Sequence, residues 1–508
     1  MDLDVTAAPV PPLQGTFATV DEAMDAAAEQ FGDREAYVDG DRRWTFAEWI
    51  AAADALAAGL AARGVRPGDV VALMLPPSID YAVAYAAALR VGAVATGLNT
   101  RLGAREVDAI IQRCQPAVVV RDASLGLPAV PGATPVIDRS ELARLVSGPG
   151  LGGGRPARRP EDPVVIIWTS GTTGLPKGAW FDHRALAAAV ATAGVLAAPF
   201  DRRLVTTPFA HAGYMAKLWE QLAWGIAVVI SPPPWTAEDM IRLVAAERIT
   251  VTGGVPTQWA KVVEHPALDT ADTSSLRLCV SATAPAPPEL VERVHRRLGC
   301  PIVVRYAMTE SPSITGTDPG EAPDVLYRTV GKPQAGVDLE LRDDEGRRVP
   351  DGEVGRVHVR SRCAMRGYWR DEERTAEAFT PDGWLRSGDL GRLDGAGNLV
   401  LVGRTSDLYI RGGYNVYPLE VENVLAEHPA VAQASIVGVP APVIGEIGVA
   451  FVVPADPAAP PSDVALRAWC RERLADYKAP DELVLVEALP LTPMLKVDKL
   501  ALARLARG

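Results

Sequence analysis

The stretch that decides the fold is Trp168-Thr169-Ser170-Gly171-Thr172-Thr173-Gly174-Leu175-Pro176-Lys177-Gly178. It combines three glycines, four hydroxyl side chains and one lysine, and it follows an apolar run, 164–167, that predicts a strand. Glycines leave backbone N–H groups open to a polyphosphate, while hydroxyls and an ammonium group add donors and charge. We therefore predict a phosphate-binding loop at the end of a strand. Taken alone, the loop leaves a plain Gly/Thr-rich surface turn as an equal alternative.

The loop does not match the common nucleotide motif G-x-x-x-x-G-K-[ST]. Pro176 stands where that motif requires its second glycine, and Gly178 follows Lys177 where a serine or threonine is needed. A P-loop NTPase is therefore disfavoured, and the rest of the chain must identify the chemistry.

Composition limits the classes of partner. With 508 residues, of which 48% are hydrophobic and 22% charged, we expect a globular protein of more than one domain. A net charge of −12 offers no electrostatic footprint for nucleic acid or an anionic membrane surface. The Ala-rich runs 82–98 and 185–200 are too weakly apolar to predict a membrane span.

Cysteine usage and the N-terminal residues predict a reduced, cytoplasmic setting. The five cysteines are scattered and never form a C-x-x-C pair, and the six histidines show no metal-binding spacing. No basic residue precedes Arg34, so we expect no secretory signal.

The order of predicted elements indicates an α/β fold. Residues 45–65 have a helical period after Thr45 as N-cap with Glu48 three residues on, 69–75 read as a buried strand, and 80–97 repeat the unit. This alternation predicts largely parallel sheets. We interpret residues 147–160 as a flexible linker, because no predicted strand leads into the G-x-G-x-x-G match within them.

Further along, the pattern changes twice. Short β runs with turn signals occupy about 326–403, and helix and strand patterns return after 404. We predict a large, multi-lobed N-terminal domain, 1–403, with parallel sheets and a β-rich subdomain at about 326–403. A small α+β C-terminal domain, 404–508, follows.

Several ordered motifs accompany the glycine-rich loop. They are PFAHAG at 208–213, YAMTE at 306–310, GWLRSGDLG at 383–391, GRTSDLYIRGGYNVYPLEVE at 403–422 and LPLTPMLKVDK at 489–499. With these motifs the chain resembles the adenylate-forming superfamily of acyl-CoA synthetases, luciferases and adenylation domains over roughly residues 15–505. One such motif is weak evidence, whereas the set in family order is strong.

The resemblance implies an ATP site. The residues that would grip the β- and γ-phosphates are Thr169, Ser170, Gly171, Thr172, Thr173, Gly174 and Lys177. Tyr306 is expected near adenine, Thr309 at the α-phosphate and Glu310 on Mg²⁺, a hard cation suited to carboxylate oxygens. Ala284 belongs to a segment, 281–285, that flanks the acyl and adenine pockets.

Asp389 and Arg404 are expected to hold the ribose. A hairpin signal, 394–398, lies between them, and folding it brings Arg404 back beside Asp389. A plain surface ion pair is the alternative for these two residues.

The resemblance also assigns the chemistry. Lys496, on a mobile C-terminal domain, would neutralise charge as the acid and the α-phosphate react, and His211 would lie at the mouth of the acyl pocket. ATP, Mg²⁺ and, as second substrate, CoA are the implied cofactors, and rotation about a hinge near Arg404 would admit the CoA thiol. A homodimer and a carrier protein stay open as partners.

Four positions depart from the family pattern. Ala307 and Ala282 add side-chain volume beside the pockets, which favours a small or aromatic acid over a long chain. Ser406 and Leu495 replace the usual hinge residue and the glycine before the lysine, which weakens the case for the second half-reaction.

The leading hypothesis is an acyl-CoA ligase that works through an acyl-AMP. An amine, a carrier-protein thiol, or nitrite in diazo formation are alternative acceptors or substrates within the same fold. A nucleotide-binding homologue without catalysis is the alternative of another class. An α-amino acid is disfavoured, because 208–215 contain no Asp to meet its ammonium group.

Overall fold

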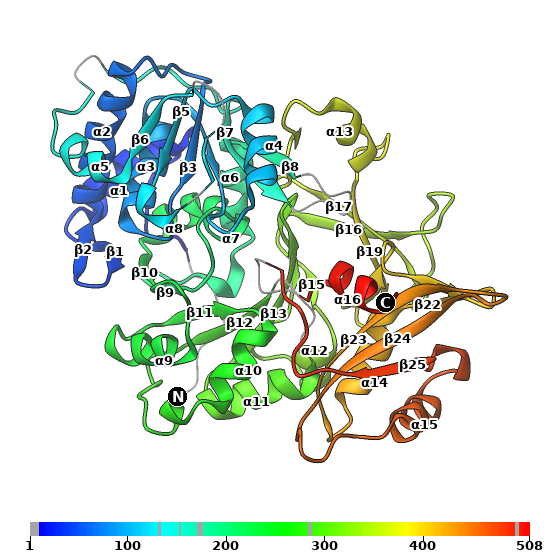
Figure 1. The fold of residues 1–508 in the computed structure, drawn as a ribbon. Helices are drawn as coiled ribbons and strands as arrows, with labels where there is room; N and C mark the ends of the chain where they lie inside the picture. The colour runs from blue at the N-terminus through cyan, green and yellow to red at the C-terminus, as the bar shows by residue number, and fades with distance from the viewer. Residues whose placement is uncertain are drawn as a thin grey trace.

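The computed structural model describes residues 10–126, 128–130, 134–151, 154–169, 176–282, 287–492 and 497–507. Its strands form four sheets, called here A, B, C and D, with nine, seven, four and five strands. Sheets A, B and C lie in the larger N-terminal part, and sheet D lies in the smaller C-terminal part (Figure 1). The predicted α/β class, with a large N-terminal and a small C-terminal domain, is confirmed.

Sheet B carries the glycine-rich segment at the ends of two neighbouring strands. Its order is β18-β8-β7-β4-β3-β5-β6. The strands are β3 Val70–Met74, β4 Val94–Gly97, β5 Val118–Arg121, β6 Val136–Asp138, β7 Pro163–Thr169, β8 Lys177–Asp182 and β18 Gly367–Tyr368. The strands from β7 to β6 in that order pair in parallel, and β8 and β18 pair antiparallel at one edge.

Helices cover both faces of sheet B. Val71 and Leu73 of β3 pack against α2 and α3 in the main core, and Val70, Ala72 and Met74 pack against α4. Successive strand residues point to opposite faces, so both faces of a parallel strand must be apolar. The covering helices are α1 Val20–Phe31, α2 Phe46–Ala62, α3 Ile79–Arg90, α4 Ala104–Cys114, α5 Arg139–Leu145 and α6 His183–Ala191.

The predicted start of the first long helix is confirmed. Thr45 accepts a hydrogen bond from the Glu48 amide at 3.2 Å, and Glu48 accepts one from the Thr45 amide at 2.8 Å, which forms a capping box. The helix ends at Ala62 rather than near 65, because Gly64 adopts a positive φ of 87° that breaks the helical backbone.

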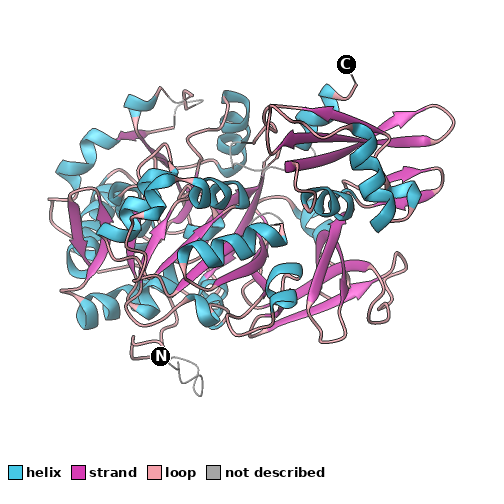
Figure 2. Ribbon diagram, turned by 90° about the horizontal axis from the view of Figure 1, so that it is seen from below, coloured by secondary structure: helices cyan, strands magenta, loops and turns pink. Residues whose placement is uncertain are grey.

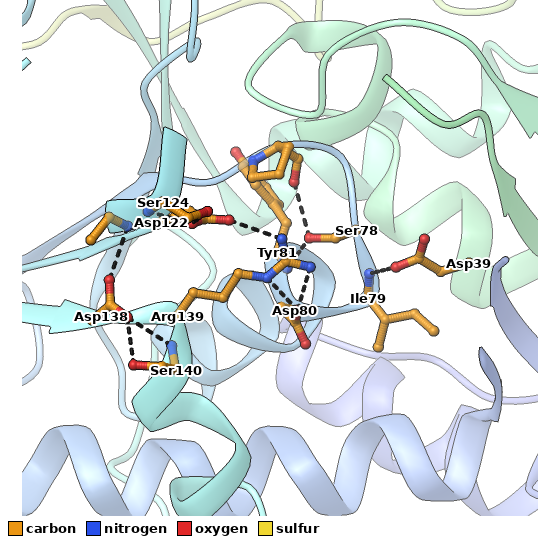
Figure 3. A network of polar contacts seen from close by, with 12 residues as sticks. Asp39, Ser78, Ile79, Asp80, Tyr81, Asp122, Ser124, Asp138, Arg139 and Ser140 are labelled. Atoms are coloured by element: carbon orange, nitrogen blue, oxygen red, sulfur yellow. Dashed lines mark hydrogen bonds and ion pairs between the residues drawn. The ribbon is translucent and has the colours of Figure 1, made fainter. Parts of the chain in front are cut away.

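Ionic contacts join the carboxyl ends of β3, β5 and β6 (Figure 3). Arg139, at the start of α5, binds Asp80 after β3 at 2.7 Å and Asp122 after β5 at 3.0 Å. Asp138, the last residue of β6, caps α5 by accepting from the Ser140 amide at 3.0 Å. These residues contribute to the lining of a cavity of about 600 Å³. The residues that the motifs single out do not belong to this lining.

Sheet A has the order β15-β14-β13-β12-β11-β9-β10-β1-β2. Its strands are β1 Glu35–Asp39, β2 Arg42–Thr45, β9 Arg202–Val205, β10 Ala227–Ile230, β11 Val251–Gly254, β12 Leu278–Ala282, β13 Ile302–Met308, β14 Ser311–Gly316 and β15 Lys332–Pro333. Its helices are α9 Ala237–Ala246, α10 Pro256–Glu264, α11 Pro288–Leu298 and α12 Pro323–Arg328. Two short helices, α7 Ala212–Met215 and α8 Leu218–Trp224, lie between sheets A and B (Figure 1).

Sheet C is antiparallel and lies within the predicted β-rich stretch. Its strands are β16 Val337–Arg342, β17 Gly355–Ser361, β19 Leu385–Leu393 and β20 Leu399–Arg404, and α13 Glu372–Ala378 precedes β19. The predicted hairpin joins β19 to β20, and Asp394 accepts hydrogen bonds from the amides of Ala396 and Asn398 at 2.9 and 2.8 Å.

Sheet D forms the body of the C-terminal domain, beside the layered N-terminal part (Figure 2). Its strands are β21 Tyr409–Arg411, β22 Tyr414–Val416, β23 Val431–Ala441, β24 Gly445–Pro454 and β25 Glu482–Leu485. Its helices are α14 Pro418–Ala426, α15 Asp463–Arg473 and α16 Lys499–Leu505. Tyr409 packs against Gly438 and Gly448, where a Cβ would lie 2.4 and 2.2 Å from its atoms, so both positions require glycine.

The connecting segments complete the description. Short 3₁₀ helices are η1 Ala123–Leu125, η2 Gly194–Leu196, η3 Pro266–Asp269 and η4 Asp476–Lys478. The described part of 147–160 contains no helix or strand, in keeping with the predicted linker. None of the helices in the described residues is long and apolar enough to cross a membrane.

We predict that His183 makes the fold acid-sensitive. His183 is 2% exposed and its Nδ1 accepts a hydrogen bond from the Val20 amide at 3.0 Å, which ties α1 to α6. Burial, with help from Arg158, lowers the pKa of His183 from 6.5 to about 4. The folded protein binds a proton at His183 less tightly than the unfolded chain does. Neutral His183 therefore contributes fully to the stability of the fold above its unfolded pKa, and this contribution is lost as the pH falls from 6.5 to 4. The loss is about 3 kcal/mol.

The measurement is urea unfolding of the wild type and of His183→Asn at pH 7.5 and pH 4.5. Asn keeps an acceptor without the titration, so the variant should lose less free energy of unfolding on acidification. His265→Asn is the matched control, since His265 also accepts a backbone hydrogen bond, from Ala267. An equal acid-induced loss in wild type and His183→Asn would show that His183 is not the sensitive group.

Candidate active site

The described ends of the glycine-rich loop lie side by side. Thr169 ends β7, Lys177 begins β8, and the two residues are paired in register. Seven of the predicted site residues lie outside the described residues: Ser170, Gly171, Thr172, Thr173, Gly174, Ala284 and Lys496. Leu495, beside the predicted lysine, lies outside them as well.

A tyrosine links Lys177 to Glu310. The Lys177 ammonium lies 5.3 Å from the centroid of the Tyr368 ring, and the Tyr368 hydroxyl donates to Glu310 Oε1 at 2.7 Å. Both Tyr368 and Glu310 are 8% exposed. Burial and the neighbouring Glu310 raise the pKa of Tyr368, so the hydroxyl keeps its proton and acts as the donor. Sequence reasoning missed Tyr368, because its contact with Glu310 spans 58 residues of chain.

Asp389 lies between Tyr306 and Arg404. The Tyr306 hydroxyl donates to Asp389 Oδ2 at 2.5 Å, and Arg404 Nε donates to Oδ1 at 3.1 Å. The β19–β20 hairpin pairs Asp389 with Arg404 in register, so it brings the two residues together as the turn signal predicts. Burial raises the pKa of Asp389 against the opposing effect of Arg404, which is itself 58% exposed.

His211 lies at the N-terminus of α7 and contacts Asn99 after β4. The distance between Asn99 Nδ2 and His211 Nε2 is 3.0 Å, and His211 is half-buried. Thr309 is also half-buried and lies in the turn between β13 and β14. Sequence reasoning missed Asn99, which no motif marks.

Three aromatic residues and one methionine after His211 belong to the main core. Tyr214, Met215, Trp219 and Trp224 are 5%, 0%, 5% and 4% exposed. The Tyr214 ring stacks on Phe209 with 3.6 Å between centroids, and its hydroxyl lies 2.8 Å from that of Tyr37. These contacts give the four side chains a packing role.

The segment after Arg404 is held by short polar contacts. Thr405 donates to the Gly388 carbonyl at 3.0 Å, and Ser406 donates to Asp407 at 2.9 Å. Lys499 of α16 lies 3.6 Å from Asp407 and 2.9 Å from Glu422. Lys499 is therefore engaged in ion pairs within the C-terminal part.

Glu310 provides a single buried carboxylate. Over the residues that the structure describes, no group of three or more His, Cys, Asp or Glu side chains is arranged to hold a metal ion. Mg²⁺ commonly uses one or two carboxylates together with substrate phosphates rather than a cage of protein ligands. A lone Glu310, linked to Lys177 through Tyr368, fits that mode.

Two family models match different parts of the chain. Residues 24–369 match the family described as AMP-binding enzyme, and 420–496 match the AMP-binding enzyme C-terminal domain. The ligase of Mycobacterium tuberculosis named 3-[(3aS,4S,7aS)-7a-methyl-1,5-dioxo-octahydro-1H-inden-4-yl]propanoyl:CoA ligase is 36% identical over 507 residues, which cover 95% of this chain and 97% of the relative.

Two further proteins are similar along most of the chain. A feruloyl-CoA synthase of Amycolatopsis sp is 35% identical over 467 residues, 91% of this chain and 93% of the relative. The crystal structure of ATP-bound MatB from Rhodopseudomonas palustris superimposes with a TM-score of 0.87 at 28% identity, covering 96% of this chain and 99% of that chain.

We predict that Tyr368→Phe destabilises the protein by about 2 kcal/mol, because it removes the hydroxyl that donates to a buried carboxylate while keeping the ring under Lys177. Urea unfolding at neutral pH measures the difference. Tyr414→Phe, at a ring that is 58% exposed, is the matched control and should change little. Equal stability of Tyr368→Phe and wild type would contradict this reading of the contact.

Proposed function

We propose that the substrate of this protein is a small or aromatic carboxylic acid. The chain belongs to the AMP-binding enzyme family and is an AMP-forming acid–CoA ligase. The acid reacts with ATP to give an acyl-AMP and pyrophosphate, and the acyl group then passes to CoA. The names of the two relatives carry this proposal, since an indenyl propanoyl group and a feruloyl group both contain rings. The added side chains of Ala282 and Ala307 support it by narrowing the acid site.

The phosphates are assigned to the end of β7 and the start of β8. Thr169 and Lys177 flank the loop 170–176, so both can donate to the β- and γ-phosphates. Thr309 is assigned to the α-phosphate, and Glu310, held by Tyr368, is the ligand assigned to Mg²⁺. The ion supplies positive charge at the phosphates, where negative charge develops on the leaving pyrophosphate.

Asp389 and Arg404 are assigned to the ribose, and Tyr306 to the adenine. The Asp389 carboxylate is oriented by donors on both oxygens, and a carboxylate oxygen can accept more than one hydrogen bond. The ribose hydroxyls can therefore join without displacing Tyr306.

We place the domain boundary at Arg404, with 1–403 as the ATP- and acid-binding domain and 404–508 as a mobile domain. Lys496, from that mobile domain, is assigned to the transfer of the acid to the α-phosphate. The side chains of Thr405 and Ser406 donate to the Gly388 carbonyl and to Asp407, and small polar side chains of this kind tolerate the φ/ψ change that rotation requires. His211 is assigned to the entrance for the acid.

A product screen tests the function. The protein is incubated with ATP, Mg²⁺ and a library of small, aromatic and long-chain acids, and pyrophosphate release is measured. CoA, amines, a carrier protein and nitrite are then supplied in separate reactions, and product masses identify the acceptor. We expect ring-containing or short acids to react best and to give CoA thioesters. Pyrophosphate release without thioester for every acid, or a preference for long chains, would refute the proposal.

We predict that Asp389→Asn raises the KM for ATP by about tenfold or more, because charge-assisted hydrogen bonds to the ribose are lost. Its thermal midpoint should not fall, since burial already disfavours the Asp389 carboxylate in the folded protein. Steady-state kinetics and thermal unfolding check both statements. Asp338→Asn, on β16 of the same sheet at a side chain 63% exposed, is the control. An unchanged KM for ATP would show that Asp389 does not bind the ribose.

A further inference from the structure

Arg305 lies on the face of sheet A that borders the assigned acid site. It is in the middle of β13 and is paired in register with Ala282 of β12 and Gly316 of β14. Residues paired in register, and residues two apart on one strand, point to the same face. Arg305 therefore shares its face with Ala282, one of the two residues proposed to narrow the acid site, whereas an irregularity between Tyr306 and Met308 interrupts the alternation at Ala307.

The Arg305 guanidinium is buried with two of its nitrogens unpaired. Arg305 is 8% exposed, and its Nη1 donates to the Thr317 carbonyl at 2.9 Å. Its Nε and Nη2 are buried and have no hydrogen-bond partner among the residues that the structure describes. Within the described ranges, no carboxylate lies close enough to Arg305 to form an ion pair, although Asp318, Glu321 and Glu220 act on it from farther away. An unpaired buried charge is costly unless something neutralises it.

Glycine at position 316 makes room for this side chain. A Cβ there would lie 1.5 Å from Nη1 of Arg305, so any other residue would displace the guanidinium. Burial lowers the pKa of Arg305, but a guanidinium stays charged in proteins. The position thus accommodates a buried cation for which the described residues provide no carboxylate within ion-pair distance.

The buried carboxylate on α8 is already engaged with two other cations. Glu220 is 1% exposed and pairs with Arg203 of β9 at 2.7 Å and with Lys217 at 2.9 Å. These partners lower the pKa of Glu220 to about 2, so it is ionised at neutral pH. Arg305 is not part of these ion pairs, and Asp318, Glu321 and Glu220 act on its charge only from farther away. Lys217 follows α7, which begins at His211, the residue assigned to the entrance for the acid.

We infer that Arg305 binds a second carboxylate on the acid substrate, so that the enzyme activates dicarboxylic acids. This inference rests on the proposed function and specifies its substrate class. A carboxylate at the far end of the acid would accept hydrogen bonds from the free N–H groups of Arg305 and neutralise its charge at close range. A neutral polar group would satisfy the donors and leave the charge unpaired.

The strand sets the length of the acid. Arg305 precedes Thr309, the residue assigned to the α-phosphate, by four positions, and because β13 is irregular after Tyr306 and ends at Met308, the two residues lie at most about 13 Å apart along the chain. The arginine side chain can span part of the distance between its backbone and the α-phosphate. The two carboxylates of the acid should therefore lie on the order of 10 Å apart. An eight-carbon chain or an aryl ring with a short side chain has that length, in keeping with the ring-containing groups proposed above.

The test compares acids that differ only at the far end. Pyrophosphate release is measured with octanedioate, its monomethyl ester and octanoate, and with 4-carboxycinnamate and cinnamate. We expect at least one diacid to exceed its matched monoacid and ester by tenfold or more in kcat/KM. A preference for the monoacid or the ester in both sets, or no reaction with either set while other acids react, overturns the inference. Absence of pyrophosphate release with every acid would instead refute the proposed function.

Variants separate recognition from folding. Arg305→Met should lower kcat/KM for the diacid at least tenfold, mainly through KM, with little change for the monoacid. Arg305→Lys should restore part of the preference, because it keeps the charge. An equal loss for diacid and monoacid would show that Arg305 is structural. The thermal midpoint and the KM for ATP report whether each variant folds, and if Arg305→Met does not fold, the wild-type comparison of matched acids decides.

Discussion

The hydrogen bond from Tyr368 to Glu310 is the contact on which the site depends. Tyr368 lies on β18, at the edge of sheet B, and Glu310 lies in the turn between β13 and β14 of sheet A. One buried bond therefore joins the two large sheets. It also places a carboxylate near Lys177, whose ammonium lies over the same tyrosine ring. The three groups act together because the low polarity around them strengthens each interaction.

Short hairpins provide the rest of the geometry. The turn at 394–398 returns the chain so that Arg404 pairs with Asp389, and the β7–β8 pairing brings Lys177 back to Thr169. In both cases two polar residues that are close in sequence become neighbours in space through an antiparallel ladder. Such local pairings need only turn residues and alternating strands, so a sequence pattern can reveal them.

Other parts of the site depend on contacts between distant segments. Asn99 meets His211 across 112 residues, and Tyr368 meets Glu310 across 58. Neither Asn99 nor Tyr368 stands in a motif that announces the contact. Tyr214 shows a different case: its ring stacks on Phe209 and its hydroxyl contacts that of Tyr37, so it is a core residue although it lies close to His211 in the sequence. Apolar periodicity reports burial without identifying what the side chain is buried against.

The sequence by itself determined the α/β class, the order of its elements, the capped start of the helix after Thr45, the Asp389–Arg404 hairpin and the family resemblance. These follow from local patterns: periodicity, capping residues, turn residues and short motifs. Only the tertiary structure decided that Tyr368 supports Glu310, that Tyr214 and Trp219 are core residues, and that Arg305 is buried with unpaired nitrogens. The reason is physical, because burial and pairing depend on which distant strands and helices pack together, and no local pattern specifies those neighbours.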